Sequence, residues 1–300
     1  MLLKLNVKQI PQAIRTIELE QNFAYRQRVK DLYFLKRINM PSVYTHYKFA
    51  CDAFDFLSEG LKEAVQTGRK FYDTGQSGAD LLFYYKPYKT NDLRKHGSAL
   101  HKIKADELFS EFKNRVYKSG NKVADIAYLT GYFTHFILDS TMHPYIWKCE
   151  EEKLAPHFVI EADYDRKLML RDGVNPYNAK FLSFQVNDGE VREVCSRYLS
   201  CTPKQTGKIM RSRVNFTNLI SCQNSLLRGF LKFLFRISSN PKGNDILIPG
   251  QDVEACADIS PRLDVLYAQA LEDIKIHSKE FEDFLLREGS LGARFAKDFE

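Results

Sequence analysis

One stretch constrains this chain more than any other, an apolar segment over residues 121–143 with the periodicity and length of a helix. From Val123 to Leu138 most positions are aliphatic, aromatic or small. A helix that is apolar on nearly all sides is stable only when it is buried in a protein core. Pro144 is expected to end or kink this helix, because proline lacks the N–H that would continue it. The rest of the chain must therefore pack around this segment.

Helical periodicity recurs along the remaining chain. Apolar residues repeat three or four positions apart, and Thr202 followed by Pro203 is typical of a helix start. The expected helices cover residues 43–67, 97–118, 155–171, 219–237 and 260–287. No series of alternating strands and no internal repeat is visible. The sequence therefore predicts an all-α fold, a single multi-helix domain over residues 40–300.

Residues 1–39 differ from this domain in charge. They contain eight Lys and Arg against three Asp and Glu, a net +5 out of +6 for the whole chain. Basic and apolar positions alternate in a helical pattern, and Met40 follows. We interpret residues 1–39 as a basic helical extension appended to the domain.

Several classes of protein are excluded by what the sequence lacks. No apolar run is long enough to span a membrane, and no secretory signal is visible at the N-terminus. The six cysteines are scattered without a C-x-x-C pair, as in proteins that keep their thiols reduced. Phosphate-binding and nucleophile-elbow motifs are absent. We expect a cytoplasmic protein and, because residues 40–300 are nearly neutral, no stable nucleic-acid partner.

Imidazole and carboxylate side chains recur at metal-binding spacing. His135, Asp139 and His143 are four residues apart and share one stripe of a helix, and His157 and Glu161 repeat the step. Donors of this kind without thiolates suit catalytic zinc, which takes about four ligands. The candidate metal ligands are eight: His46, Asp80, His101, His135, Asp139, His143, His157 and Glu161. This number predicts a buried multinuclear site of the kind that cleaves phosphoesters.

A structural explanation competes with this one. A single pair of His and Asp on an apolar helix is most often a hydrogen-bonded core pair, and His135 and His143 would suffice as partners of a buried Asp139. They would not explain the second pair on the next helix. Farther along that helix, Asp163 and Asp165 are either acceptors for a ligand histidine or solvated acids.

Five blocks of sequence carry a resemblance to a known family. They read MPSVYTHY at 40–47, QSGADLLFYY at 76–85, GSALHK at 97–102, GYFTHFILDSTMHPY at 131–145 and HFVIE at 157–161. In order and spacing they resemble the bacterial zinc-dependent phospholipase C family, which shares its fold and metal site with fungal single-strand-specific nucleases. The resemblance covers residues 40–170 closely and the last helix loosely, and the fourth block is its most specific part.

The resemblance implies an all-helical fold around a cluster of up to three zinc ions. It assigns Asp80, His101, His135 and Asp139 to the first zinc, His143, His157 and Glu161 to the second, and His46 with the shared Asp139 to the third. Secreted members complete the third site with a mature N-terminal Trp. The single Trp of this chain is Trp147. We therefore expect two zinc ions or three.

The resemblance also implies a reaction, the zinc-dependent hydrolysis of a phosphodiester bond by an activated water. The substrate would be a small phosphodiester or a phospholipid, and Asp80 is the expected catalytic residue that orients the water or takes its proton. Two alternatives stay open. One is a nuclease or nucleotide phosphodiesterase with the same site, and the other is a metal-stabilised helical binding module without catalysis.

Residues 219–237 have two interpretations. Arg228, Lys232 and Arg236 share one face, opposite a face of Leu and Phe. This is the pattern of an amphipathic helix that lies on a membrane surface, which would make the protein a peripheral membrane partner. A core helix with one exposed basic stripe has the same pattern. We favour the core helix, because apolar helix faces in globular domains mostly pack inward.

Overall fold

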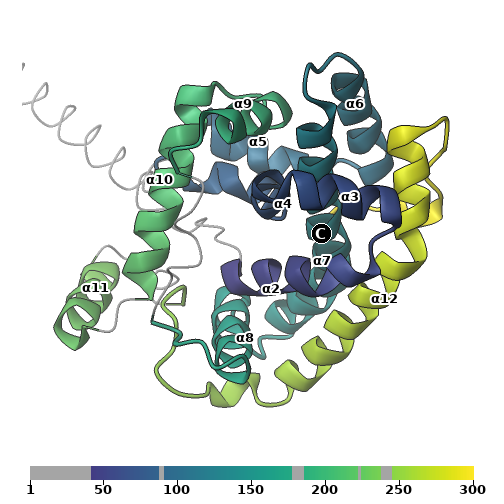
Figure 1. Ribbon diagram of the computed structural model, residues 1–300. Helices are drawn as coiled ribbons and strands as arrows, with labels where there is room; N and C mark the ends of the chain where they lie inside the picture. The colour runs from purple at the N-terminus through teal and green to yellow at the C-terminus, as the bar shows by residue number, and fades with distance from the viewer. Residues whose placement is uncertain (1–41, 88–90, 178–185, 222–223, 238–244) are drawn as a thin grey trace, which may run out of the picture.

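The computed structural model describes residues 42–87, 91–177, 186–221, 224–237 and 245–300. Within these ranges the chain forms helices and turns and no β-strand, which confirms the all-α single domain (Figure 1). The expected extension over residues 1–39 lies outside the described residues. Among the helices that are described, none is long and apolar enough to cross a membrane.

The helices follow one another along the chain with short connections. The α-helices are α2 (Val43–Ala53), α3 (Glu59–Thr67), α4 (Arg69–Gly75), α5 (Asp92–Leu100), α6 (Ala105–Tyr117), α7 (Lys122–Glu151), α8 (His157–Arg171), α9 (Gly189–Tyr198), α10 (Pro203–Ile220), α11 (Ser225–Ile237) and α12 (Ile259–Leu286). Short 3-10 helices are η2 (Phe54–Phe56), η3 (Gly78–Tyr84), η6 (Glu254–Cys256) and η7 (Ala293–Phe295).

The apolar helix α7 is the centre of the domain, as its sequence predicts. Helices α2, α3, α4 and α12 pack against it, and α12 follows the side of the molecule around it (Figure 1). The aromatic rings between Tyr128 and Phe136 are fully buried, and Phe133 stacks on Phe281 of α12 with ring centroids 4.4 Å apart. Burial of this continuous apolar surface supplies the main driving force for the fold.

Glycines let α4 approach α7 closely. A Cβ at Gly131 of α7 would lie 2.3 Å from the carbonyl oxygen of Tyr72, and one at Gly75 of α4 would lie 2.0 Å from that of Tyr128. No side chain fits at such distances, so the two backbones touch directly. This contact sets the position of residues 76–80, which follow α4, relative to the donors on α7.

Pro144 was expected to end or kink the apolar helix over residues 121–143. The expectation that it ends the helix is wrong. Helix α7 continues past Pro144 to Glu151. Tertiary contacts outweigh the helix-breaking tendency of proline. About two turns and one turn before Pro144, Arg294 donates to the Ile137 carbonyl and to the Thr141 hydroxyl at 3.3 and 2.9 Å, which ties α7 to the C-terminal segment.

Two predicted helices are each divided in two. The segment 43–67 breaks at Leu57 and Ser58, whose backbone is extended. There the amide of Ser58 donates to the hydroxyl of Ser278 at 2.6 Å, a bond to α12 that replaces a bond within the helix. The segment 97–118 breaks between Leu100 and Ala105, because the amide of Ala105 donates to the carbonyl of Lys297 at 2.8 Å.

The second half contains one accurate prediction and one wrong one. Thr202 caps α10 in a complete capping box with Gln205, with Pro203 in the first turn. The segment 219–237 instead ends α10 at Ile220 and starts α11 at Ser225. The favoured interpretation of a core helix is wrong for the described side chains of α11, since Leu226 is 83% exposed and Phe230 and Phe233 are each 56% exposed.

Candidate metal centre

Helix α7 aligns three of the predicted donors along one stripe. Asp139 lies between the two histidines of this helix: its Oδ2 is 3.1 Å from Nε2 of His135, and its Oδ1 is 3.9 Å from Nε2 of His143. All three side chains lie in or next to the core. The helical spacing thus places a buried carboxylate where it can serve two neighbouring sites.

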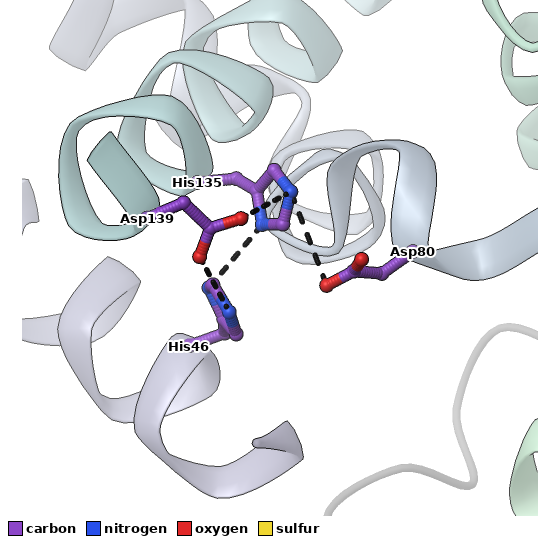
Figure 2. Close-up of side chains that lie close together, drawn as sticks. All are labelled: His46, Asp80, His135 and Asp139. Atoms are coloured by element: carbon purple, nitrogen blue, oxygen red, sulfur yellow. Dashed lines mark hydrogen bonds and ion pairs between the residues drawn. The ribbon is translucent and has the colours of Figure 1, made fainter. Parts of the chain in front are cut away.

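The first donor group consists of His46, Asp80, His135 and Asp139 (Figure 2). Each side chain offers one ligand atom, and these atoms lie within 4.8 Å of one another. Nε2 of His46, on α2, is 3.2 Å from Oδ1 of Asp139, and Oδ2 of Asp80, on η3, is 3.9 Å from Nε2 of His135. Ligands about 2.0–2.1 Å from a tetrahedral ion are about 3.3 Å apart, so little adjustment is needed for this group to hold a metal ion.

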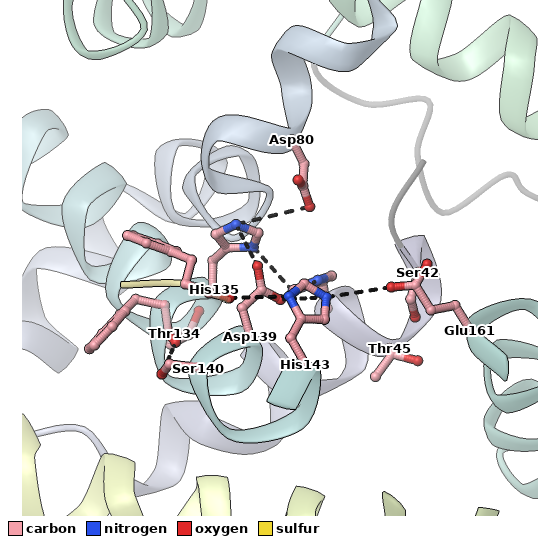
Figure 3. Close-up of polar contacts among 12 residues, drawn as sticks. Ser42, Thr45, Asp80, Thr134, His135, Asp139, Ser140, His143 and Glu161 are labelled. Atoms are coloured by element: carbon pink, nitrogen blue, oxygen red, sulfur yellow. Dashed lines mark hydrogen bonds and ion pairs between the residues drawn. The ribbon is translucent and has the colours of Figure 1, made fainter. Parts of the chain in front are cut away.

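The second donor group consists of His143, His157 and Glu161. Oε1 of Glu161 lies 3.1 Å from Nε2 of His157 and 3.5 Å from Nε2 of His143. Figure 3 shows His143 between Asp139 and Glu161, where α7 faces α8. These are the three residues that the resemblance assigns to one zinc.

Two histidines lie in other positions than the resemblance implies. His46, expected with a third zinc, belongs to the first donor group. His101, expected with the first zinc, lies beside that group, with its Nε2 3.0 Å from Oδ1 of Asp80. All eight predicted donors therefore converge on one region, but they do so as a group of four, a group of three and one adjacent histidine.

The donor set fits a cation better than a closed hydrogen-bond network. Among the described residues, Nδ1 of His157 and Oε2 of Glu161 are buried without a hydrogen-bond partner, and Nε2 of His135 and Oδ2 of Asp139 lie 3.1 Å apart without forming a hydrogen bond. Buried polar atoms of native proteins are nearly always partnered. Two groups of His, Asp and Glu could thus hold metal ions.

Two histidines have their outer nitrogen held by the backbone. Nδ1 of His101 lies 2.8 Å from the carbonyl of Gly97, and Nδ1 of His143 lies 3.1 Å from the carbonyl of Phe299. A carbonyl only accepts, so each Nδ1 carries the proton and donates it. The lone pair of the neutral ring is then on Nε2, which faces the carboxylates.

Phe299 was not predicted from the sequence. Besides accepting from His143, it donates its amide to the carbonyl of His101 at 3.0 Å, and its ring packs 5.8 Å from that of His135. One residue near the C-terminus thus contacts three of the donors. No local pattern indicates this role, because it depends on a contact across 156 residues.

Asp165 positions α2, and with it His46, instead of accepting from a ligand histidine. Its carboxylate accepts from the hydroxyl and amide of Thr45 at 2.6 and 2.8 Å, and from the Ser42 hydroxyl at 2.5 Å. It therefore anchors the first turn of α2 on α8. The other candidate acceptor, Asp163, pairs with Lys167 at 2.7 Å.

Gly78 is a further positioning residue without a signal in the sequence. Its backbone has a φ of +47°, and a Cβ there would lie 2.0 Å from Cδ2 of His135. Only glycine combines this conformation with such a close contact. The backbone of Gly78 therefore fixes the plane of the His135 ring and lets Asp80, two residues on, face the first donor group.

Burial and neighbouring charges shift the pKa values of the side chains in the metal-free centre in opposite directions. Burial lowers the pKa of His135 to about 4. Burial also opposes a proton on His143, but Asp139 and Glu161 outweigh it and raise its pKa to about 10. The pKa of Glu161 falls to about 2 despite burial, because His157 and His143 stabilise its carboxylate. Near pH 7 a cation must displace a proton from His143 to bind.

The centre borders a cleft. Asp80, His101 and the second donor group line it together with apolar rings, among them Phe83 and the half-exposed Trp147. Glu161 also borders a second, mostly apolar cavity, whose far wall contains Ile220 and Ile248. A substrate in the cleft would contact both polar donors and aromatic rings.

Comparison of the chain with protein-family models, with curated proteins and with solved structures found no match. The resemblance to zinc-dependent phospholipases C therefore remains a prediction from the five sequence blocks.

Proposed function

We propose that this protein is a metal-dependent hydrolase of phosphodiester bonds, similar to zinc-dependent phospholipases C, with two or three zinc ions at the candidate metal centre. The observation that carries the proposal is that Asp139, a member of the first donor group, also lies 3.9 Å from His143 of the second. Asp80 of the first group and all three residues of the second line one cleft. Neighbouring divalent ions joined by a carboxylate are the usual apparatus of phosphoester displacement.

Each donor group would hold one metal ion. His46, Asp80, His135 and Asp139 would hold one ion, and His143, His157 and Glu161 a second. When bound, zinc supplies Lewis acidity, which lowers the pKa of a water and offsets negative charge on phosphoryl oxygens. A third ion would draw on His101, whose Nε2 already faces Asp80.

Asp80 is the proposed proton acceptor. It borders the cleft, and one carboxylate oxygen lies 3.0 Å from His101. An oxygen of Asp80 can orient the attacking water and take its proton. The aromatic rings that line the cleft would exclude bulk water from the reacting phosphorus, which would strengthen these electrostatic interactions.

Metal content and hydrolysis together test the proposal. The purified chain should contain at least two zinc ions and hydrolyse a chromogenic phosphodiester. Asp139→Asn should lower turnover by more than about 100-fold, because losing a mere outer partner of a metal ligand costs about 10–100-fold. Asp55→Asn, at an exposed acid on η2, is the matched control and should leave turnover unchanged. Equal turnover of Asp139→Asn and wild type would overturn the mechanism.

The same measurements separate the alternatives. Rates on phosphatidylcholine, a chromogenic phosphodiester and single-stranded DNA distinguish a phospholipase or small phosphodiesterase from a nuclease. A chain that binds zinc tightly and hydrolyses none of them would be the non-catalytic binding module. A chain with no bound divalent ion would contradict all the metal-dependent proposals.

A further inference from the structure

Helix α11 exposes an apolar face that the fold does not cover. Leu226, Phe230 and Phe233 are four and three residues apart and therefore share one side of the helix, where they are 83%, 56% and 56% exposed. Within the described chain no other helix packs extensively along α11, and Figure 1 shows it at the edge of the molecule beyond α10. Three large exposed side chains on one face mark an interaction surface.

The helix is nevertheless held to the body. Leu231, on the opposite side, is 8% exposed. The guanidinium of Arg228 donates to the carbonyls of Ile220 and Ile248 at 3.4 and 2.6 Å. The apolar face is therefore presented outward by a fixed attachment.

The charge around α11 indicates what it contacts. From Asn224 to Asn244, the stretch that contains α11, the sequence has four Lys and Arg and neither Asp nor Glu. Lys232, on α11 itself, is exposed and lies on the flank between the body and the apolar face. A stretch of chain that carries basic residues, no acids and exposed Leu and Phe is complementary to a surface that is anionic outside and apolar beneath. A polynucleotide would match the positive charge but leave Leu226, the most exposed of the three side chains, in water.

We propose that α11 is a docking helix that lies flat on an anionic lipid surface. With 13 residues it is about 20 Å long, too short to span a hydrocarbon core of about 30 Å. Leu226, Phe230 and Phe233 would enter the boundary between headgroups and acyl chains, and Lys232 would contact the headgroup phosphates. This surface is separate from the metal centre and does not depend on the proposed hydrolase. Docking would, however, bring the cavity walled by Ile220 and Ile248 close to the lipid.

Vesicle binding by the full chain tests the proposal. Wild type should sediment with vesicles of phosphatidylcholine and phosphatidylserine at roughly two to one, and much less with phosphatidylcholine alone. Phe230→Ser with Phe233→Ser should weaken binding at least about tenfold, and Lys232→Glu at least about fivefold. Since residues 1–39 are basic, only differences between full-length variants are informative.

The matched controls make the same kinds of substitution on other surfaces of the protein. Val265→Ser with Ile276→Ser removes two apolar side chains of α12 that are 54% and 59% exposed, and Lys118→Glu reverses an exposed charge after α6. Both should bind vesicles like wild type. Circular dichroism and thermal unfolding verify that the α11 variants are folded.

Several results would overturn the proposal. They are no sedimentation of wild type with anionic vesicles, equal losses in the control variants, or a dimer that dissociates on the Phe substitutions while vesicle binding is absent. Binding to single-stranded RNA without binding to vesicles would do the same. Asp139→Asn should bind vesicles normally, and the Phe variant should hydrolyse a water-soluble phosphodiester normally, so failure of one proposal is distinguishable from failure of the other.

Discussion

Gly78→Ala is expected to damage the metal centre more than the fold. The added Cβ would lie 2.0 Å from Cδ2 and 2.4 Å from Nε2 of His135. An ordinary carbon contact is about 3.5–4.0 Å, so the imidazole must retreat by about 1.5 Å. A metal–nitrogen bond is about 2.0–2.1 Å long and does not survive that displacement. The first donor group should therefore lose one ligand and at least about 100-fold in zinc affinity.

The stability cost has two separable parts. A φ of +47° costs an alanine about 1–2 kcal/mol, and the overpacking against His135 adds about 1–3 kcal/mol. Gly173→Ala isolates the first part, because Gly173 has a φ of +68° and no atom within 4 Å of its added Cβ.

Urea unfolding and competition with a chromogenic zinc chelator measure both effects. Gly173→Ala should lose about 1–2 kcal/mol and no zinc affinity. Gly78→Ala should lose about 2–5 kcal/mol and most of the affinity of the first donor group. A folded Gly78→Ala protein that binds zinc like wild type would refute the conclusion that this backbone position sets the His135 ring.

Four further outcomes follow from the geometry and charges of the candidate metal centre. Deleting Phe299 and the residue after it removes the acceptor of His143, and the affinity of the second donor group should fall about 10–100-fold, measured by zinc titration. The chelated protein should lose stability as pH rises from 6.5 to about 10, since a raised pKa on His143 stabilises the fold only while the histidine is protonated. Glu161, with a pKa lowered from 4.5 to about 2, should contribute stability above pH 4.5 that is lost as pH falls toward 2; urea titrations of the chelated chain at several pH values check both signs. Asp165→Ala should cost about 2–4 kcal/mol in the same assay and weaken the first donor group, because α2 loses its anchor.

The sequence was most informative where structure depends on neighbours along the chain. The four-residue steps in the sequence predicted that His135, Asp139 and His143 share one stripe of α7, and the structure confirms this arrangement. The same holds for His157 and Glu161 on α8. The capping box at Thr202 is equally local. Pro144 shows the limit of such reasoning, because the contacts of α7 along its whole length outweigh one missing hydrogen bond.

Residues 219–237 show a second limit. Periodicity reports that a helix has an apolar face and says nothing of what covers it. In the structure α10 ends at Ile220, and a separate helix, α11, begins at Ser225. Phe230 and Phe233 of α11 are exposed. The two interpretations of this segment could be distinguished only by its position outside the core.

The amino-acid sequence alone predicted the all-α class, the buried central helix and the eight candidate donor residues. It could do so because helical spacing and side-chain chemistry are properties of short segments. The tertiary structure decided how those donors are grouped. It brought His46 into the first donor group and set His101 beside it. It also recruited Gly78, Asp165 and Phe299 to hold the centre. Such contacts join residues tens to more than a hundred positions apart, and their distances follow from how whole helices pack.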